Sequence, residues 1–230
     1  MLVSPSDLVL LFIAIFIIFF FLLLFKSTNQ EKYLDLKYRS LPNHTERSFF
    51  KALSKSAKEH DYKGYVGEFK FLFRRLLNYI LHLISKIVPY SGFRIILHRW
   101  RGVSIGDKVH IGPSVSIDDV YPNYLIIEDG VSIAGLNFIL THSKPLKFHK
   151  KLSDSFVAPV LIMENAWIAI GVIILPGVTI GKGSIIASGS VVTESIPDNV
   201  FAGGCPAKII KSFKLDNNGK PIGFKQYKNE

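Results

Sequence analysis

The sequence predicts a mainly β protein, a parallel β-solenoid that follows a membrane-spanning helix and amphipathic α-helices. The solenoid is indicated by an aliphatic residue that recurs every six residues through much of the stretch from Ile105 to Val192. The spanning helix is indicated by an unbroken apolar run near the N-terminus. The amphipathic helices are indicated by apolar residues at helical spacing among basic ones.

Residues 1–26 are predicted to form a membrane anchor. Leu8 to Phe25 are eighteen consecutive apolar residues, with Asp7 before them and Lys26 after them. At about 1.5 Å a residue they make roughly 27 Å of helix, enough to cross a hydrocarbon core with its flanks. The alternative is a cleaved signal peptide. It needs a basic n-region, a shorter apolar stretch and a small-residue cleavage site, and this sequence has none of them.

The charge that follows the anchor predicts its orientation. Residues 26–101 contain sixteen Lys and Arg against six Asp and Glu, a surplus of ten that equals the net charge of the whole chain, +10. Positive flanks are retained on the cytoplasmic side of a membrane. The N-terminus is therefore expected outside and the rest of the chain in the cytoplasm. The single Cys205 allows no intrachain disulfide, which is compatible with a reducing compartment.

A linker is predicted at residues 27–62 and an amphipathic helical segment at 63–101. Apolar residues recur at three- and four-residue spacing, so a helix is expected up to about Val88, broken by Pro89 and resumed near Phe93. A basic stretch can bind nucleic acid, but helical spacing beside a membrane anchor favours anionic lipid headgroups. The alternative is that these helices only pack on the domain that follows.

A solenoid is predicted for residues 102–211, followed by a C-terminal tail at 212–230. Six is a multiple of the two-residue period of a strand and not of the 3.6-residue period of a helix, so each hexad is a short strand and a turn. Three hexads make one coil of a triangular prism, and the aliphatic side chains stack in three columns along its axis. The columns are Ile105, Ile127, Ile162 and Ile180; Ile111, Ile133, Ile168 and Ile186; and Ile117, Ile139, Ile174 and Val192.

Two insertions interrupt the period. Ile117 and Ile127 lie ten residues apart, and Ile139 and Ile162 lie twenty-three apart, so four and seventeen residues are inserted. Both insertions leave the same corner of the predicted prism. Glycines such as Gly112 directly follow aliphatic positions, where the chain turns and the absence of Cβ is useful.

The run "ENAWIAIGVIILPGVTIGKGSIIASGSVVTESIPDNVFAGGCPAKIIK" closely resembles the hexapeptide-repeat acyltransferases. These include the galactoside, maltose and serine acetyltransferases and many polysaccharide O-acetyltransferases. The resemblance covers about residues 100–211. It implies a left-handed parallel β-helix, a homotrimer with active sites in the grooves between neighbouring subunits, and acetyl-coenzyme A (acetyl-CoA) as the acyl donor.

His142 is the candidate general base. It stands in "ILTHS", where the second insertion begins, and the family places its catalytic histidine in this context. Acyl transfer to a hydroxyl needs a base near neutral pH, and histidine is the natural one. The histidines of the linker and helices are expected to be ordinary surface or interfacial residues: His44, His60, His82 and His98.

Register places Asp118 and Asp119 one coil below Thr141 and His142. A strand spacing of about 4.8 Å brings a carboxylate within reach of either the imidazole or an acceptor hydroxyl. Both aspartates are therefore candidates for orienting the base or binding the acceptor. The alternative is two turn-forming acidic residues at a corner.

The resemblance also implies a set of residues that bind acetyl-CoA. A tryptophan lies near the thioester and the acceptor, three residues match positions along the pantetheine arm, and two lysines match basic residues near the nucleotide phosphates. These are Trp167; Ile170, Ser188 and Thr193; and Lys208 and Lys211. An anionic nucleotide needs cations at the mouth of its groove, which agrees with the two lysines. Ala169 and Glu194 depart from the family pattern and leave the acceptor open.

The sequence therefore predicts a membrane-anchored O-acetyltransferase that transfers acetyl from acetyl-CoA to a sugar hydroxyl of a glycan or lipid-linked glycan precursor. Its expected partners are membrane lipid, the acceptor and further copies of the chain in a homotrimer; no metal and no nucleic acid are expected. One alternative is an N-acyltransferase of an amino sugar or nucleotide sugar, and another is a non-catalytic β-helix scaffold. A third is a zinc carbonic anhydrase of the same fold, with His110, His142 and His149 as ligands.

Overall fold

The computed structural model describes residues 39–40, 54, 57–58, 62, 64–144, 155–219 and 221–226. The predicted membrane span, most of the predicted linker and His149 lie outside the described residues. Within those ranges no helix combines the length and the apolar character that crossing a membrane requires.

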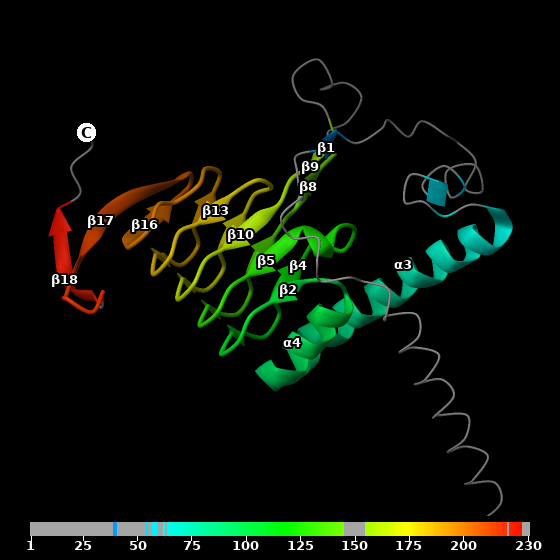
Figure 1. Ribbon diagram of the computed structural model, residues 1–230, viewed down its shortest axis with the longest axis horizontal. Helices are drawn as coiled ribbons and strands as arrows, with labels where there is room; N and C mark the ends of the chain where they lie inside the picture. Colours follow the sequence, from blue (N-terminus) through cyan, green and yellow to red (C-terminus); the bar gives the residue numbers. More distant parts are fainter. Residues whose placement is uncertain are drawn as a thin grey trace, which may run out of the picture. The chain divides into compact units, whose positions relative to one another are not determined.

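In the described range from residue 64 onward, two helices precede a stack of short strands (Figure 1). The helices are α3 (Gly64–Ile87) and α4 (Ser91–Trp100), and the short helix η2 (Pro122–Tyr124) follows later. The strands are β1 (Arg39–Ser40), β2 (Ser104–Ile105), β3 (His110–Ile111), β4 (Ser116–Ile117), β5 (Leu125–Ile127), β6 (Ser132–Ile133), β7 (Phe138–Ile139), β8 (His142–Ser143), β9 (Phe156–Val157), β10 (Val160–Ile162), β11 (Trp167–Ile168), β12 (Ile173–Ile174), β13 (Thr179–Ile180), β14 (Ile185–Ile186), β15 (Val191–Val192), β16 (Val200–Gly204), β17 (Ala207–Leu215) and β18 (Pro221–Gln226).

The strands form three parallel sheets, one for each predicted column. They stack in the orders β2-β5-β10-β13, β3-β6-β11-β14-β16 and β4-β7-β12-β15. In the first sheet Ile105 pairs with Ile127, Ile127 with Ile162 and Ile162 with Ile180, and the other two columns pair as predicted. The column residues are buried at the prism's centre, because each points inward from its strand. The parallel solenoid is thus confirmed, and its architecture fits the left-handed form that the resemblance implies.

Both insertions leave the third sheet and return to the first. The shorter one joins β4 to β5 and carries η2, and the longer one joins β7 to β10 and carries the antiparallel pair β8 and β9. Elsewhere the coils stack closely. A Cβ on Gly112 would lie 2.5 Å from the backbone nitrogen of Gly135 in the next coil, so this position accepts only glycine.

The C-terminal end of the stack closes with an antiparallel unit. β16 runs parallel to β14 on one side and antiparallel to β17 on the other, and β18 pairs with β17. The strands continue to Gln226, through most of the segment predicted as a tail.

The N-terminal end of the stack is closed by arginines of α4 and the residue after it. In each later coil the carbonyl of the column residue accepts a hydrogen bond from the coil before it: Gly106 N to Ile127 O at 2.8 Å, Gly112 N to Ile133 O at 2.7 Å, and Asp118 N to Ile139 O at 2.9 Å. The first coil has no coil before it. Its three column carbonyls would lack donors, which is costly for buried backbone groups.

Three guanidinium groups supply these donors. Arg94 Nε lies 2.8 Å from Ile111 O, Arg99 Nη2 lies 2.8 Å from Ile105 O, and Arg101 Nη2 lies 3.0 Å from Ile117 O. Ser91 Oγ accepts the Ile111 N–H at 2.9 Å, so α4 also replaces an acceptor of the missing coil. The structure therefore shows that these arginines pack on the solenoid, which was the predicted alternative to lipid contact. His82 and His98 are buried at the same interface.

We expect Arg94→Met to lower the free energy of unfolding by about 2–3 kcal/mol, because a buried carbonyl loses a charged donor and Met supplies none. The matched control is Arg74→Met. Arg74 is exposed and donates to the Tyr62 hydroxyl at 3.2 Å, its one hydrogen bond to a described residue, so its replacement should change stability by less than about 0.5 kcal/mol. Urea unfolding followed by circular dichroism measures both. Equal stability losses in the two variants would contradict the capping role.

Candidate functional site

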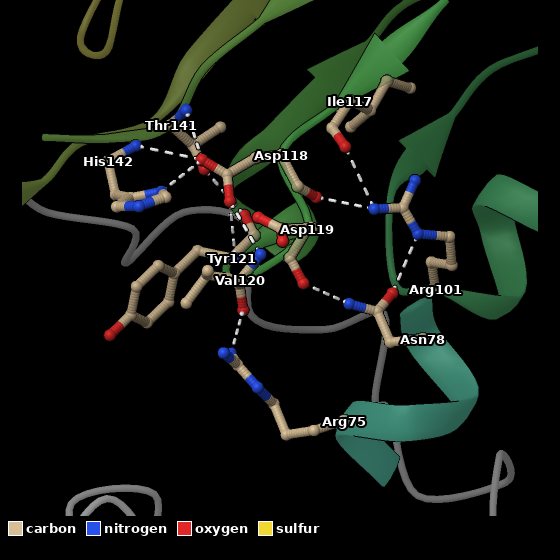
Figure 2. Close-up of polar contacts among 10 residues, drawn as sticks. All are labelled: Arg75, Asn78, Arg101, Ile117, Asp118, Asp119, Val120, Tyr121, Thr141 and His142. Carbon is tan, nitrogen blue, oxygen red and sulfur yellow. Dashed lines mark hydrogen bonds and ion pairs between the residues drawn. The ribbon is translucent and has the colours of Figure 1, made fainter. Parts of the chain in front are cut away.

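The candidate site lies at the corner where both insertions leave the prism (Figure 2). Asp118 follows β4 directly, and His142 opens β8 one coil later. The Asp118 N–H donates to Ile139 O at 2.9 Å, so the regular ladder still holds at this point and fixes the two segments in register. The regular hydrogen bond between these two neighbouring coils therefore positions Asp118 and His142 relative to each other.

The Asp118 carboxylate is saturated with donors. Its Oδ1 accepts the backbone N–H groups of Val120 and Tyr121, both at 2.9 Å. Its Oδ2 accepts the backbone N–H of Thr141 at 2.9 Å and of His142 at 3.2 Å, and His142 Nδ1 lies 2.6 Å from the same oxygen. The Asp118 side chain is fully buried. This aspartate thus fixes both the loop conformation and the imidazole.

The pKa values of the two side chains respond to this contact. Burial alone would raise the pKa of the Asp118 carboxyl, but hydrogen bonds from His142 and from backbone N–H groups hold it well below its usual range. The hydrogen bond to Asp118 raises the pKa of His142 above its ordinary value, against the opposing effect of burial. Because a carboxylate can only accept, Nδ1 carries the hydrogen in the neutral imidazole and Nε2 holds the lone pair.

His142 can therefore act as a base through Nε2. No hydrogen bond joins Nε2 to another residue of the described part of the chain, and the His142 side chain is 23% exposed. The Tyr121 ring meets the imidazole edge to face, with the ring centroids 5.6 Å apart. The arrangement supplies an oriented, partly buried imidazole whose protonated form is stabilised by a carboxylate.

Helix α3 supports the loop that carries Asp118. Asn78 Nδ2 donates to the Asp119 carbonyl, and Arg75 Nη1 donates to the Val120 carbonyl at 3.4 Å. Arg101 Nε donates to Asn78 Oδ1 at 2.8 Å, and Arg101 Nη2 donates to the Asp118 carbonyl at 2.7 Å. Sequence reasoning missed these supports. The one available signal was Asn78, the only amide side chain within α3.

The structure distinguishes between the two aspartates. Asp118 binds His142, as one of the predicted alternatives states. Asp119 is exposed, and the contacts among described residues do not join its carboxylate to His142. Its carbonyl instead binds α3.

The residues that the resemblance assigns to acetyl-CoA lie on other parts of the prism. Trp167 begins β11 and is 51% exposed, and Ile170 is 49% exposed at the next turn. Ser188 is exposed at the matching turn one coil later, where Gly189 N donates to Ile170 O at 2.9 Å. Thr193 is exposed just after β15. No hydrogen bond or ring contact between described residues joins any of them to His142.

Both lysines of the predicted set lie exposed on β17. Lys208 Nζ is 3.6 Å from Glu194 Oε2, an exposed ion pair that holds the lysine only weakly. Lys211 Nζ lies 5.3 Å from the centre of the Phe224 ring. Both cations are accessible to an anionic ligand.

Two of the three histidines considered as zinc ligands are described. His110 lies on β3 in the second sheet and His142 on β8 in a separate small sheet, so they belong to different faces of the molecule. Over the described ranges there is no group of three or more His, Cys, Asp or Glu residues placed to hold a metal ion.

The chain is similar to known acetyltransferases. Residues 159–194 match the family described as bacterial transferase hexapeptide (six repeats). The galactoside O-acetyltransferase of Escherichia coli is 36% identical over 134 residues, which are 55% of this chain and 64% of that enzyme. That of Lactococcus lactis is 33% identical over 143 residues, 60% of this chain and 59% of the enzyme. The chain thus spans about half to two thirds of the length of these curated relatives.

Solved structures show the same fold. A hexapeptide-repeat acetyltransferase from Vibrio cholerae, in complex with acetyl-CoA, has 26% identity and a TM-score of 0.53 and covers 63% of this chain and 90% of that one. A galactoside acetyltransferase in complex with coenzyme A has 29% identity and a TM-score of 0.50, and covers 68% and 88%. The stacked hexads, the pairing of the columns and these similarities together show the fold of the hexapeptide-repeat acyltransferases.

Proposed function

We propose that this protein is an O-acetyltransferase that moves the acetyl group of acetyl-CoA to a sugar hydroxyl of a glycan or lipid-linked glycan. The observation that carries the proposal is the Asp118–His142 pair, which holds Nε2 as an oriented base at a corner of the prism. Two relatives named galactoside O-acetyltransferases and a neighbour that binds acetyl-CoA support the donor and a hydroxyl acceptor. An N-acyltransferase would use the same base, but no observation here favours an amine.

The chemistry follows from the base. Nε2 of neutral His142 takes the proton of the acceptor hydroxyl as its oxygen attacks the thioester carbon of acetyl-CoA. The tetrahedral intermediate collapses, the carbon–sulfur bond breaks, and the thiolate of coenzyme A takes a proton from the His142 imidazolium. Asp118 stabilises that imidazolium between the two proton transfers and keeps Nδ1 protonated throughout.

A complete site needs a second copy of the chain in this proposal. The residues proposed to bind acetyl-CoA are Trp167, Ile170, Ser188, Thr193, Lys208 and Lys211. They lie away from His142 within one prism, whereas a groove between two prisms can bring one chain's His142 beside its neighbour's Trp167. A cyclic homotrimer would supply three such grooves.

We further propose that residues 8–25 anchor the enzyme in a membrane, with the solenoid in the cytoplasm. The apolar run and the ten surplus positive charges after it support this topology. An anchor suits an acceptor that is itself carried by the membrane, and acetyl-CoA is available on the same side.

His142→Ala is expected to lower turnover by about 10²–10⁴-fold and leave acetyl-CoA binding nearly intact, because the base acts on the acceptor proton. The matched control is His110→Ala, an exposed histidine on β3, which should retain activity. Release of the coenzyme A thiol, with a β-galactoside and separately with membrane glycolipids as acceptor, measures turnover. Full activity of His142→Ala would refute the proposed base.

Asp118→Asn is expected to move the acid limb of the pH–rate profile to lower pH. Activity needs neutral His142 and is lost as the pH falls through its pKa, which Asp118 holds above the ordinary value. Removing the negative charge lowers that pKa, while loss of tautomer control lowers the maximum rate by about 10²–10⁴-fold. Asp119→Asn should shift the limb less. An unmoved acid limb in Asp118→Asn would show a purely structural role.

Mixing two inactive variants tests the shared site. Equal amounts of His142→Ala and Trp167→Ala chains are unfolded and reassembled together. If each site combines His142 of one chain with Trp167 of its neighbour, a quarter of the sites in random trimers have both residues intact. The mixture should then regain roughly a quarter of the activity of the unaltered trimer. Each variant reassembled alone is the control. Light scattering should give three chains for every preparation. No recovery from trimers of mixed composition would place both residues in one chain's site.

A further inference from the structure

Helices α3 and α4 expose an unusual amount of apolar surface. Among the described residues, fourteen of the twenty-two exposed large apolar side chains lie between Tyr65 and Trp100. Phe69, Ile87 and Phe93 are 69%, 80% and 59% exposed. Soluble monomers rarely leave so many large apolar side chains together in water, and such a patch marks a surface that meets another apolar phase.

Many of these side chains line one side of each helix. On α3 they recur every three or four residues, which is the spacing of one side of a helix, and on α4 they show the same spacing. The apolar face, as defined here, consists of Phe69, Leu72, Leu76, Ile80, Leu83 and Ile87 on α3 and Phe93, Ile96 and Trp100 on α4.

The opposite side of α4 is polar and buried. Arg94 and, just after the helix, Arg101 face the solenoid and cap the first coil, and His98 is buried beside Arg101. A surface helix of a soluble domain normally does the reverse, with its apolar side on the core and its polar side in water. The orientation of α4 is therefore set by the cap, and the apolar face is left outside.

Charge identifies what covers the apolar face. Residues 64–101 contain a single acidic residue, Glu68, and seven Lys and Arg. Three of the seven are engaged at the cap, which leaves Lys70, Arg74, Arg75 and Lys86 on α3. A second copy of the chain would bring an equally basic surface against this one, whereas the anionic headgroups of a membrane complement it. Tyr79, Tyr90 and Trp100 also lie exposed here, and such amphipathic rings are enriched at membrane interfaces.

We propose that α3 and α4 lie in the surface of an anionic membrane, with the apolar face among the upper acyl segments and Lys70 and Lys86, which flank that face on α3, at the headgroups. This contact is separate from the predicted span at residues 8–25 and needs no further protein.

The membrane contact also indicates which kind of acceptor the enzyme uses. This inference rests on the proposed acetyl transfer. The polar contacts of Asn78 and Arg75 tie α3 directly to the loop of Asp118. A helix is about 10–12 Å across with its side chains, so the loop that holds the base would lie roughly one helix diameter from the lipid surface. The geometry favours an acceptor carried by a lipid over a soluble sugar.

The two tryptophans of the chain allow a direct test. Trp100 belongs to the apolar face, and Trp167 lies on the solenoid in the third coil, about 10 Å along the axis from the first. The full-length Trp167→Phe chain, which retains Trp100, is reconstituted into vesicles of equal parts phosphatidylglycerol and phosphatidylcholine with brominated acyl chains. Bromine quenches an indole that touches the acyl region. The Trp100→Phe chain, which retains Trp167, is the control.

We expect Trp100 fluorescence to fall about two-fold or more and Trp167 fluorescence to change little. Quenching of Trp100 should weaken in vesicles of phosphatidylcholine alone, because the headgroup attraction is lost. It should also weaken in Leu83→Asp, but not in Phe138→Asp, which alters an equally exposed apolar residue on β7. These readouts do not depend on catalysis, so failure of the acetyl-transfer proposal would leave them unchanged.

Two results would overturn the proposal. One is an unquenched Trp100 together with a disulfide between two chains that carry Leu83→Cys and Cys205→Ser, which would show that the apolar face meets a second copy. The other is an unquenched Trp100 with no such crosslink, which would show that the face stays in water.

Discussion

A stack of parallel coils has to begin somewhere, and the first coil leaves three column carbonyls, which point along the axis, without donors from another coil. Here three arginines supply those donors, one for each side of the triangle. Each charged hydrogen bond is worth about 1.5–3 kcal/mol, and an unsatisfied carbonyl would lose a comparable amount. This requirement fixes where α4 lies, which of its sides faces the solenoid, and how α3 approaches the site.

The capping of the first coil also helps to position the proposed base. Arg101 caps Ile117, donates to the carbonyl of Asp118 and holds Asn78, and Asn78 in turn binds the carbonyl of Asp119. The loop that presents the Asp118 carboxylate is thus held by the cap on one side and by the ladder bond to Ile139 on the other. Because the Asp118 carboxylate binds the imidazole of His142, these contacts also fix the orientation of the imidazole.

Much of the solenoid was predictable from the sequence, because only an inward position demands an aliphatic residue at every sixth place. The columns and the common corner of the two insertions follow from counting alone, and they brought Asp118 close to His142. The choice of Asp118 over Asp119 did not follow, since both lie one coil away. It depends on the turn at Val120 and Tyr121, whose N–H groups both point to one carboxylate.

The amphipathic helices were predictable, but the side that faces inward was not, because an apolar stripe has the same period whether it faces the solenoid or the solvent. The arginines that decide it are recognised only once the unpaired carbonyls of the first coil are known.

The other end of the stack is closed by a different device. β16 continues the second sheet, and the chain then reverses so that β17 covers the outer edge of β16 with antiparallel hydrogen bonds, and β18 follows. An open parallel edge would be a template on which the first coil of another molecule could add, and repeated addition would build a fibre. With guanidinium groups over one end and a reversed strand over the second sheet at the other, neither end of the stack offers three open parallel edges to another molecule. The caps that complete the fold thus also disfavour end-to-end growth of the solenoid.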